Sequence, residues 1–76
     1  MRDYISDITK KVSLKIKLER VKRGWSQEQL AEHANLNANT IGKIERAQIS
    51  PTIDTIVQIA EAFDMDFSKL TNIVDI

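Results

Sequence analysis

Residues 26–45, SQEQLAEHANLNANTIGKIE, contain the signals for two short helices joined by a tight turn. Ser26 and Gln29 have the spacing of a capping box, which predicts that the first helix begins there. Asn35 lies where the chain must reverse, and asparagine tolerates a positive φ better than most non-glycine residues. Asn37 can then cap a second helix. The rest of the chain must therefore cover the apolar sides of a compact helix pair.

The second of these helices has two different sides. Ile41 and Ile44 share an apolar side that is expected to face inward. The opposite side carries small, amide-bearing and basic residues, namely Ala38, Asn39, Gly42, Lys43 and Arg46. A helix with an apolar back and such a front is suited to the major groove of DNA.

A long helix is predicted over residues 10–23, beginning near Asp7 or earlier and ending at Gly24. Residues 1–9 are treated as an N-terminal extension. Val12 and Ile16 form the side that is expected to pack on the helix pair. A second apolar side is expected to contact the extension or the rest of the core, in preference to another subunit; it consists of Leu14, Leu18 and Val21.

Two further helices follow, which makes the chain an all-α domain of five helices. The fourth runs to about Phe63 and is capped either by Ser50 with Pro51 or by Thr52. One apolar stripe is predicted along it, made of Ile53, Ile56, Val57, Ala60 and Phe63. Asp66 can cap a short fifth helix that contains Phe67 and Leu70, and residues 71–76 form a C-terminal tail.

Composition narrows the class of protein. Seventy-six residues suffice for a single small domain, residues 1–76. The chain has no cysteine and one histidine, so we expect no disulfide, no thiolate nucleophile and no metal site. No apolar run reaches the length of a membrane span. The acidic side chains are scattered over different helices with no nucleophilic side chain beside them. We therefore expect neither an enzyme nor a cofactor or small-molecule ligand. A cytoplasmic location is the expectation.

Charge is unevenly distributed although the net charge is zero. Residues 1–50 carry ten basic and six acidic side chains, a net charge of +4. Residues 51–76 carry one basic and five acidic side chains, a net charge of −4. Such a molecule can turn a basic face toward phosphates while its acidic end points away. An ordinary solvated surface whose charges are segregated by chance would have the same two net charges.

Three motifs resemble one known family. They are Gly24-x-Ser26-Gln27-x-x-Leu30-Ala31, Ile41-x-x-Ile44-Glu45 and Pro51-Thr52-x-x-Thr55-Ile56. Together they resemble the Xre/Cro-type helix-turn-helix family of phage and bacterial repressors, and the resemblance covers residues 16–70 without gaps. It implies a phage-repressor-like fold with residues 26–45 as the DNA-binding motif.

The resemblance also implies site residues. Base contacts are expected from Asn37, Ala38, Asn39 and Lys43, and phosphate contacts from Ser26, Gln27, Thr40, Arg46 and Thr52. Some of these have a simpler interpretation: Asn37 is also a helix cap, and Gln27 is also an ordinary exposed glutamine. Gly42 either lets the backbone approach the floor of the groove or is merely tolerated in the helix.

Arg20 and Glu45 match family positions that form an ion pair between the first helix and the end of the recognition helix. Glu45 lies beside the inward side of that helix, where an unpaired carboxylate would be costly. Three positions replace frequent family glycines, namely Asn35, Ala47 and Asp64. Glu19 replaces a frequent leucine and leaves the packing of the first helix less defined.

The expected function is a transcriptional regulator, a repressor that binds a palindromic operator in double-stranded DNA as a homodimer. One recognition helix reads only a few base pairs, so a dimer with half-sites about 10 base pairs apart is expected. The dimer contact is placed in the acidic C-terminal region, at Phe67, Leu70, Ile73 and Val74. Phage repressors, restriction–modification controllers and antitoxins remain open within the family. A protein-interaction module that lost DNA binding is the alternative from another class.

Overall fold

The computed structural model describes the backbone of residues 2–72 and the side chains of residues 7–72. Within that range the chain forms five α-helices and no strand, so the all-α prediction is confirmed. The helices are α1 (Arg2–Lys22), α2 (Gln27–Ala34), α3 (Ala38–Glu45), α4 (Ile53–Ala62) and α5 (Phe67–Leu70). The residues treated as an N-terminal extension continue α1 without a break from residue 2 onward.

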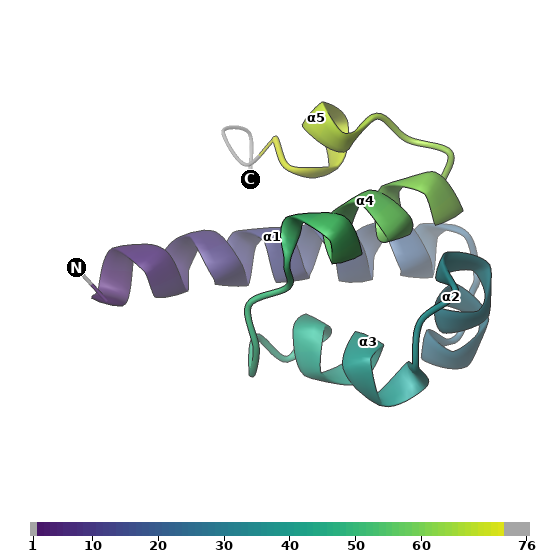
Figure 1. Ribbon diagram of the computed structural model, residues 1–76, viewed down its shortest axis with the longest axis horizontal. Coiled ribbons are helices and arrows are strands. Elements are labelled where there is room, and N and C mark those ends of the chain that lie inside the picture. The colour runs from purple at the N-terminus through teal and green to yellow at the C-terminus, as the bar shows by residue number, and fades with distance from the viewer. Residues whose placement is uncertain (1, 73–76) are drawn as a thin grey trace.

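The helices enclose one core, to which each contributes at least one fully buried side chain. In Figure 1, α4 crosses in front of the long α1, α5 lies above α4, and α2 and α3 form the opposite side of the molecule. Between them lie Ile16 of α1, Leu30 of α2, Ile41 and Ile44 of α3, Ile59 of α4 and Leu70 of α5. Because α3 packs against α1 and α2 around this core, those two helices fix its orientation.

The helix caps follow the local sequence with one exception. The Ser26 hydroxyl accepts from the Gln29 amide at 3.0 Å, and the Gln29 side chain accepts from the Ser26 amide at 2.7 Å, which completes the capping box. Thr52 caps α4, whereas the Ser50 hydroxyl instead contacts that of Thr9 at 3.2 Å. The prediction that Asp66 caps α5 is wrong in one respect, because its side chain makes no capping hydrogen bond.

All three replacements of family glycines have a left-handed backbone. The φ angles are 56° at Asn35, 57° at Ala47 and 56° at Asp64. Asparagine and aspartate occupy this region with little strain, but at Ala47 the Cβ atom costs about 1 kcal/mol. The turns that follow α2, α3 and α4 therefore keep their geometry without glycine.

The apolar stripe predicted for α4 is partly wrong. Ala60 and Phe63 are buried as expected, but Ile53 is 70% exposed and the fully buried isoleucine is Ile59. Ile53 is the first residue of α4, where the helix has not yet reached the core, and the buried side of α4 is rotated toward Ile59.

The expectation for the second apolar side of α1 is also wrong. Val12 and Ile16 are buried as predicted, but Leu14, Leu18 and Val21 are exposed to solvent in the part of the chain that the structure describes. Since residues 2–22 form one continuous helix, residues 2–9 lie along its axis and cannot fold back over that side.

The expected dimer contact needs a correction at Leu70. This side chain is fully buried in the chain's own core, so it offers no surface to a second subunit. Phe67 is half-buried and keeps some exposed surface. Ile73 and Val74 lie outside the described residues.

Glu19 is a buried carboxylate that the sequence analysis left unassigned. Its residue is only 6% exposed, and the Arg23 guanidinium donates to it at 2.7 Å, while the Lys22 ammonium lies 3.3 Å away. Arg23 also donates to the Phe63 carbonyl at 2.8 Å, which ties α1 to the end of α4. Burial alone would raise the pKa of Glu19, but the hydrogen bonds and charges of Arg23 and Lys22 outweigh it and lower this pKa.

We predict that Glu19 makes the stability of the domain sensitive to acid. The pKa of this carboxylate is lower in the folded protein than in the unfolded chain, where it is usually 4.5. Its contribution to stability is therefore complete at pH values above the unfolded pKa and is lost as the pH falls through the folded pKa. Glu19→Gln should lower the free energy of unfolding by about 2 kcal/mol at neutral pH and by less in acid. Urea unfolding at a series of pH values measures both effects, with Glu28→Gln at an exposed site as control. An equal loss at every pH would contradict the assignment.

Candidate nucleic-acid interface

The outward side of α3 carries three polar side chains in a row. Asn39, Lys43 and Arg46 are spaced four and three residues apart, which places them on one side of the helix, and all three are exposed. Ile41 and Ile44 on the other side are fully buried. The helix therefore presents an amide and two cations to solvent while two isoleucines hold it from behind.

The beginning of α3 is set by Asn37. Its side-chain oxygen accepts a hydrogen bond from the Asn39 amide at 2.7 Å, so the helix-cap interpretation applies, and the side chain remains exposed. This bond uses the oxygen and leaves the two N–H donors of the side chain for another acceptor. Ala38 and Thr40 in the first turn are half-buried, and Ala38, which was expected on the outward side, packs against the core.

A buried ion pair holds the other end of α3. Arg20 donates from Nε to Oε2 of Glu45 at 2.7 Å and from Nη2 to Oε1 at 3.0 Å, so the pair expected from the family is bidentate. Arg20 Nη1 also donates to the Trp25 carbonyl at 2.7 Å. The Glu45 side chain is 2% exposed and that of Arg20 13%. The last turn of α3 is thus fixed to α1 and to the turn that precedes α2.

Gln27 also contacts this ion pair, and this contact was not predicted from the sequence. It is half-buried, and its Nε2 donates to Oε1 of Glu45 at 3.1 Å. The first residue of α2 is therefore tied to the last residue of α3, and one N–H of the Gln27 amide remains for another acceptor. The signal in the sequence was the buried acceptor itself, because a carboxylate that is nearly inaccessible needs more than one donor.

Gly42 has a structural role that neither of its two interpretations anticipated. This glycine is buried, and a Cβ atom built on it would lie 3.0 Å from Arg46 Nη1 and 3.3 Å from Gln27 Oε1. The absent side chain leaves the space in which the Arg46 guanidinium lies back over α3 beside Gln27. The approach to a groove floor that we considered for Gly42 remains a hypothesis.

The two remaining expected phosphate contacts are caps at the beginnings of helices. The Ser26 and Thr52 hydroxyls accept from the amides of Gln29 and Thr55, and Thr52 also donates to the Thr55 hydroxyl at 3.0 Å. Both residues are exposed and lie at helix ends whose first N–H groups have no partner within the helix.

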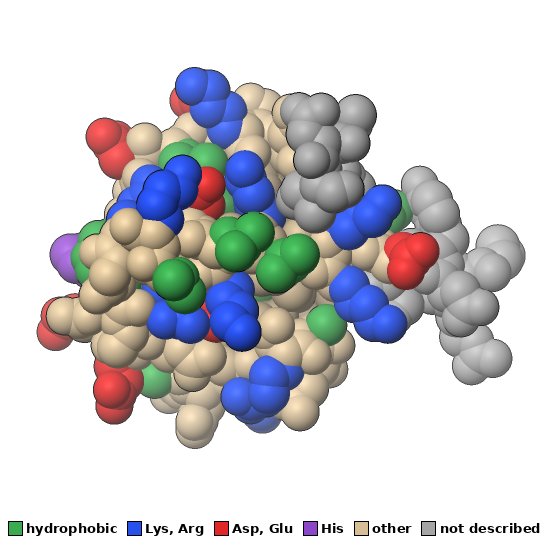
Figure 2. All heavy atoms as spheres, turned by 180° about the vertical axis from the view of Figure 1, so that it is seen from behind, with side chains coloured by type: hydrophobic (Ala, Val, Ile, Leu, Met, Phe, Trp, Pro, Cys, Tyr) green, Lys and Arg blue, Asp and Glu red, His purple; other side chains and the backbone are tan. Residues whose placement is uncertain are grey.

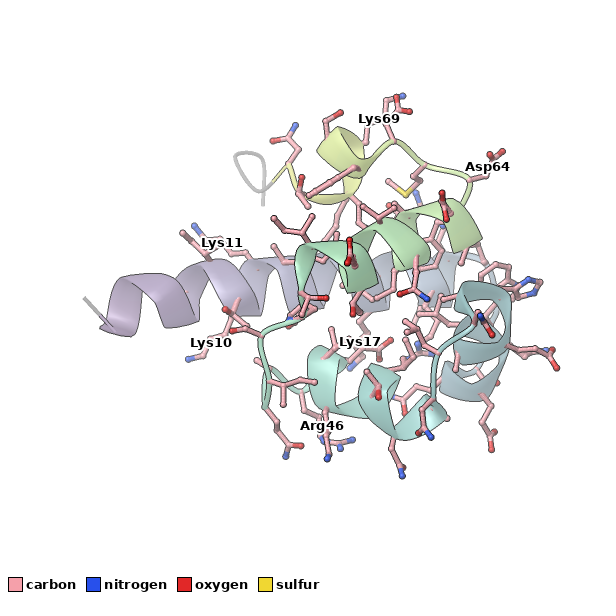
Figure 3. The ribbon with its side chains drawn as sticks, viewed as in Figure 1. Lys10, Lys11, Lys17, Arg46, Asp64 and Lys69 are labelled. Carbon is pink, nitrogen blue, oxygen red and sulfur yellow. The ribbon has the colours of Figure 1, made fainter. Side chains whose placement is uncertain are left out.

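The charges at the two ends of the molecule differ. No ion pair involves Lys43 or Arg46 among the described side chains. Figure 3 shows Arg46 on α3 at one edge of the molecule and Asp64, next to α4, at the other. This arrangement agrees with the basic and acidic halves of the sequence and leaves the cations of α3 available to an anionic partner.

No three of the His, Asp and Glu side chains described lie close enough to hold a metal ion. None of the described helices combines the length and the apolar character that crossing a membrane requires.

We predict that the ion pair between α1 and α3 is a major source of stability. Glu45→Ala leaves the Arg20 guanidinium without its partner and should lower the free energy of unfolding by about 3 kcal/mol. Urea unfolding followed by circular dichroism measures the change. Glu32→Ala, on the exposed side of α2, is the matched control and should change the free energy by less than about 0.5 kcal/mol. Similar small losses for both variants would show that the pair contributes little.

Comparison with known proteins identifies the family. Residues 16–70 match the HTH_3 family model, described as helix-turn-helix. The chain is 34% identical over 64 residues to the HTH-type transcriptional regulator SutR of Escherichia coli, covering 84% of this chain and 36% of that protein, so it spans about a third of that relative's length.

Comparison with solved structures supports the same family. The restriction–modification controller protein C.AhdI of Aeromonas hydrophila superposes with a TM-score of 0.79 at 29% identity, covering 82% of this chain and 94% of that one. A mutant of the controller protein C.Esp1396I gives 0.77 at 33% identity, covering 84% and 89%. An HTH_3 family transcriptional regulator of Vibrio cholerae gives 0.82 at 29% identity, covering 86% and 36%. The chain therefore belongs to the Xre/Cro-type helix-turn-helix family.

Proposed function

We propose that this chain binds double-stranded DNA in a sequence-specific manner through α3 and regulates transcription as a repressor. The observation that carries the proposal is the outward row of Asn39, Lys43 and Arg46 on a helix whose opposite side is fully buried. Family membership supports it, since the matched relatives are transcriptional regulators and restriction–modification controllers.

Base readout in this proposal falls to the first two turns of α3. The Asn39 amide can pair with N6 and N7 of adenine, and Lys43 can donate to O6 and N7 of guanine. The free N–H donors of Asn37 reach an acceptor on a base edge, and the Ala38 methyl touches the methyl group of thymine. The side-chain oxygen of Asn37 remains bonded to the Asn39 amide, so Asn37 can contact only hydrogen-bond acceptors on the bases.

Phosphate binding falls to side chains around this row. Gln27 holds Glu45 with one N–H and offers the other to a phosphate, and Arg46 lies beside it over Gly42. Two neighbouring donors of this kind fix the register of a helix on DNA without reading sequence. Ser26 and Thr52 add the free amides at the beginnings of α2 and α4, and Thr40 flanks the row.

A homodimer on two half-sites completes the proposal, because one helix that reads a few base pairs gives too little affinity at physiological salt. Its contact is placed on the exposed part of Phe67 together with Ile73 and Val74, without Leu70.

We predict that variants at a base-reading residue and at a phosphate-binding residue change DNA affinity in different ways. This difference distinguishes a DNA-binding role from a protein-binding role. On a site selected from random duplexes, Asn39→Ala should cost about 1 to 3 kcal/mol, with little effect on random DNA. Arg46→Gln should weaken binding to both and lower the slope of log affinity against log salt by about one. Fluorescence anisotropy over a salt series measures both.

Lys69→Gln is the matched control, because Lys69 is an exposed cation on α5, on the edge of the molecule opposite Arg46 (Figure 3). It should leave affinity and salt slope within error of the unaltered chain. Binding that does not depend on salt, or an effect of Lys69→Gln equal to that of Arg46→Gln, would rule out the proposed interface.

A further inference from the structure

An apolar stripe on α1 is exposed away from the core. Leu14, Leu18 and Val21 are spaced four and three residues apart and therefore share one side of the helix. They are 45%, 52% and 55% exposed. In Figure 2, which views the molecule from behind, hydrophobic side chains gather at the centre of the face among Lys and Arg side chains. Three large side chains exposed in a row are more than scattered surface residues and indicate an interaction surface.

Lysines border this stripe on both sides. Helical spacing places Lys10 and Lys17 along one border and Lys11, Lys15 and Lys22 along the other. Figure 3 shows Lys10 and Lys11 projecting from opposite sides of α1. We call the stripe with its two lysine borders the α1 face.

The α1 face has a surplus of positive charge. Lys15 and Lys22 lie 3.7 and 3.3 Å from the carboxylate of Glu19 and share that single negative charge with Arg23. Lys10, Lys11 and Lys17 form no ion pair with any described side chain. An occupant of the face must therefore bring apolar side chains for the centre and negative charge for both borders.

We propose that the α1 face docks an acidic amphipathic helix of another protein. Leucine-like side chains spaced three and four residues apart on that helix would cover Leu14, Leu18 and Val21, and aspartate or glutamate on either side would meet the lysines. This interaction goes beyond DNA binding. None of its residues belongs to the row on α3.

Charge complementarity argues against other occupants. Two copies paired through the same face would set lysines against lysines, which is repulsive. Apart from Asp7 on α1, the described exposed acids of this chain that could meet those lysines lie on other elements: Glu28 and Glu32 on α2, Asp54 and Glu61 on α4, and Asp64 and Asp66 between α4 and α5. A contact between them and the α1 face would be heterologous and would leave each copy with an open site, which builds filaments instead of a closed dimer. DNA phosphates match the lysines but not the apolar stripe between them.

The test uses the full chain and a synthetic probe of defined chemistry. The probe is a fluorescent helical peptide of about four turns with leucine at the stripe positions and glutamate on both sides. Two analogues carry lysine in place of glutamate, or serine in place of leucine. Anisotropy should report saturable binding of the acidic peptide, and the two analogues should bind at least about tenfold more weakly.

Matched variants locate the binding. Leu18→Ser and the double variant Lys10→Glu with Lys17→Glu should each weaken binding of the acidic peptide about tenfold or more. Ile53→Ser, an exposed isoleucine on α4, and Lys69→Glu, an exposed lysine on α5, should change it less than about twofold. Circular dichroism checks that each variant is folded, and Leu14→Ser replaces Leu18→Ser if the latter is not.

Several outcomes would overturn the proposal. One is failure of the acidic peptide to bind, and another is equal weakening by Leu18→Ser and Ile53→Ser. Sedimentation equilibrium in which the unaltered chain self-associates and Leu18→Ser does not would assign the face to a second copy. Binding to vesicles of phosphatidylglycerol and phosphatidylcholine that is tighter than binding to the peptide, and is lost in Leu18→Ser, would assign it to a lipid surface.

Discussion

The ion pair between Arg20 and Glu45 is the interaction on which the functional side of this domain depends. A carboxylate that is 2% exposed is costly to bury unless donors surround it, and here Arg20 supplies two hydrogen bonds and Gln27 a third. These bonds come from α1 and α2 and converge on the last residue of α3. With Ile41 and Ile44 in the core, they leave α3 a single orientation, and that orientation determines which side chains face outward.

The same contacts explain why several residues serve the fold and the proposed interface together. Gln27 contributes one N–H to the anchor of α3 and keeps the other for a partner, while Gly42 leaves the space in which Arg46 lies beside it. Asn37 likewise caps α3 with its oxygen and keeps its N–H donors. A side chain that is held by the protein loses little conformational entropy when it binds, so such sharing favours a pre-organised surface.

Features that are encoded locally could be predicted from the sequence. The capping box at Ser26, the left-handed turn at Asn35 and the two sides of α3 all depend on residues within a few positions of each other. Features that depend on the packing of distant helices could not. Nothing local distinguishes Ile53, which is exposed, from Ile59, which is buried, or shows that nothing in the described chain covers Leu18. Glu19 lies between these cases, because lysine and arginine at three and four residues' distance were a visible signal for its ion pairs.

The central claim is that α3, held from behind by buried contacts, offers its outward side to DNA. Amide NMR of the isotope-labelled chain during titration with a duplex tests it most directly, because it reports every backbone position at once. The account predicts that the largest shifts fall on α3 from Asn37 to Arg46 and on the first turn of α2. Shifts concentrated on the exposed side of α1 or on α5, with α3 unchanged, would contradict it.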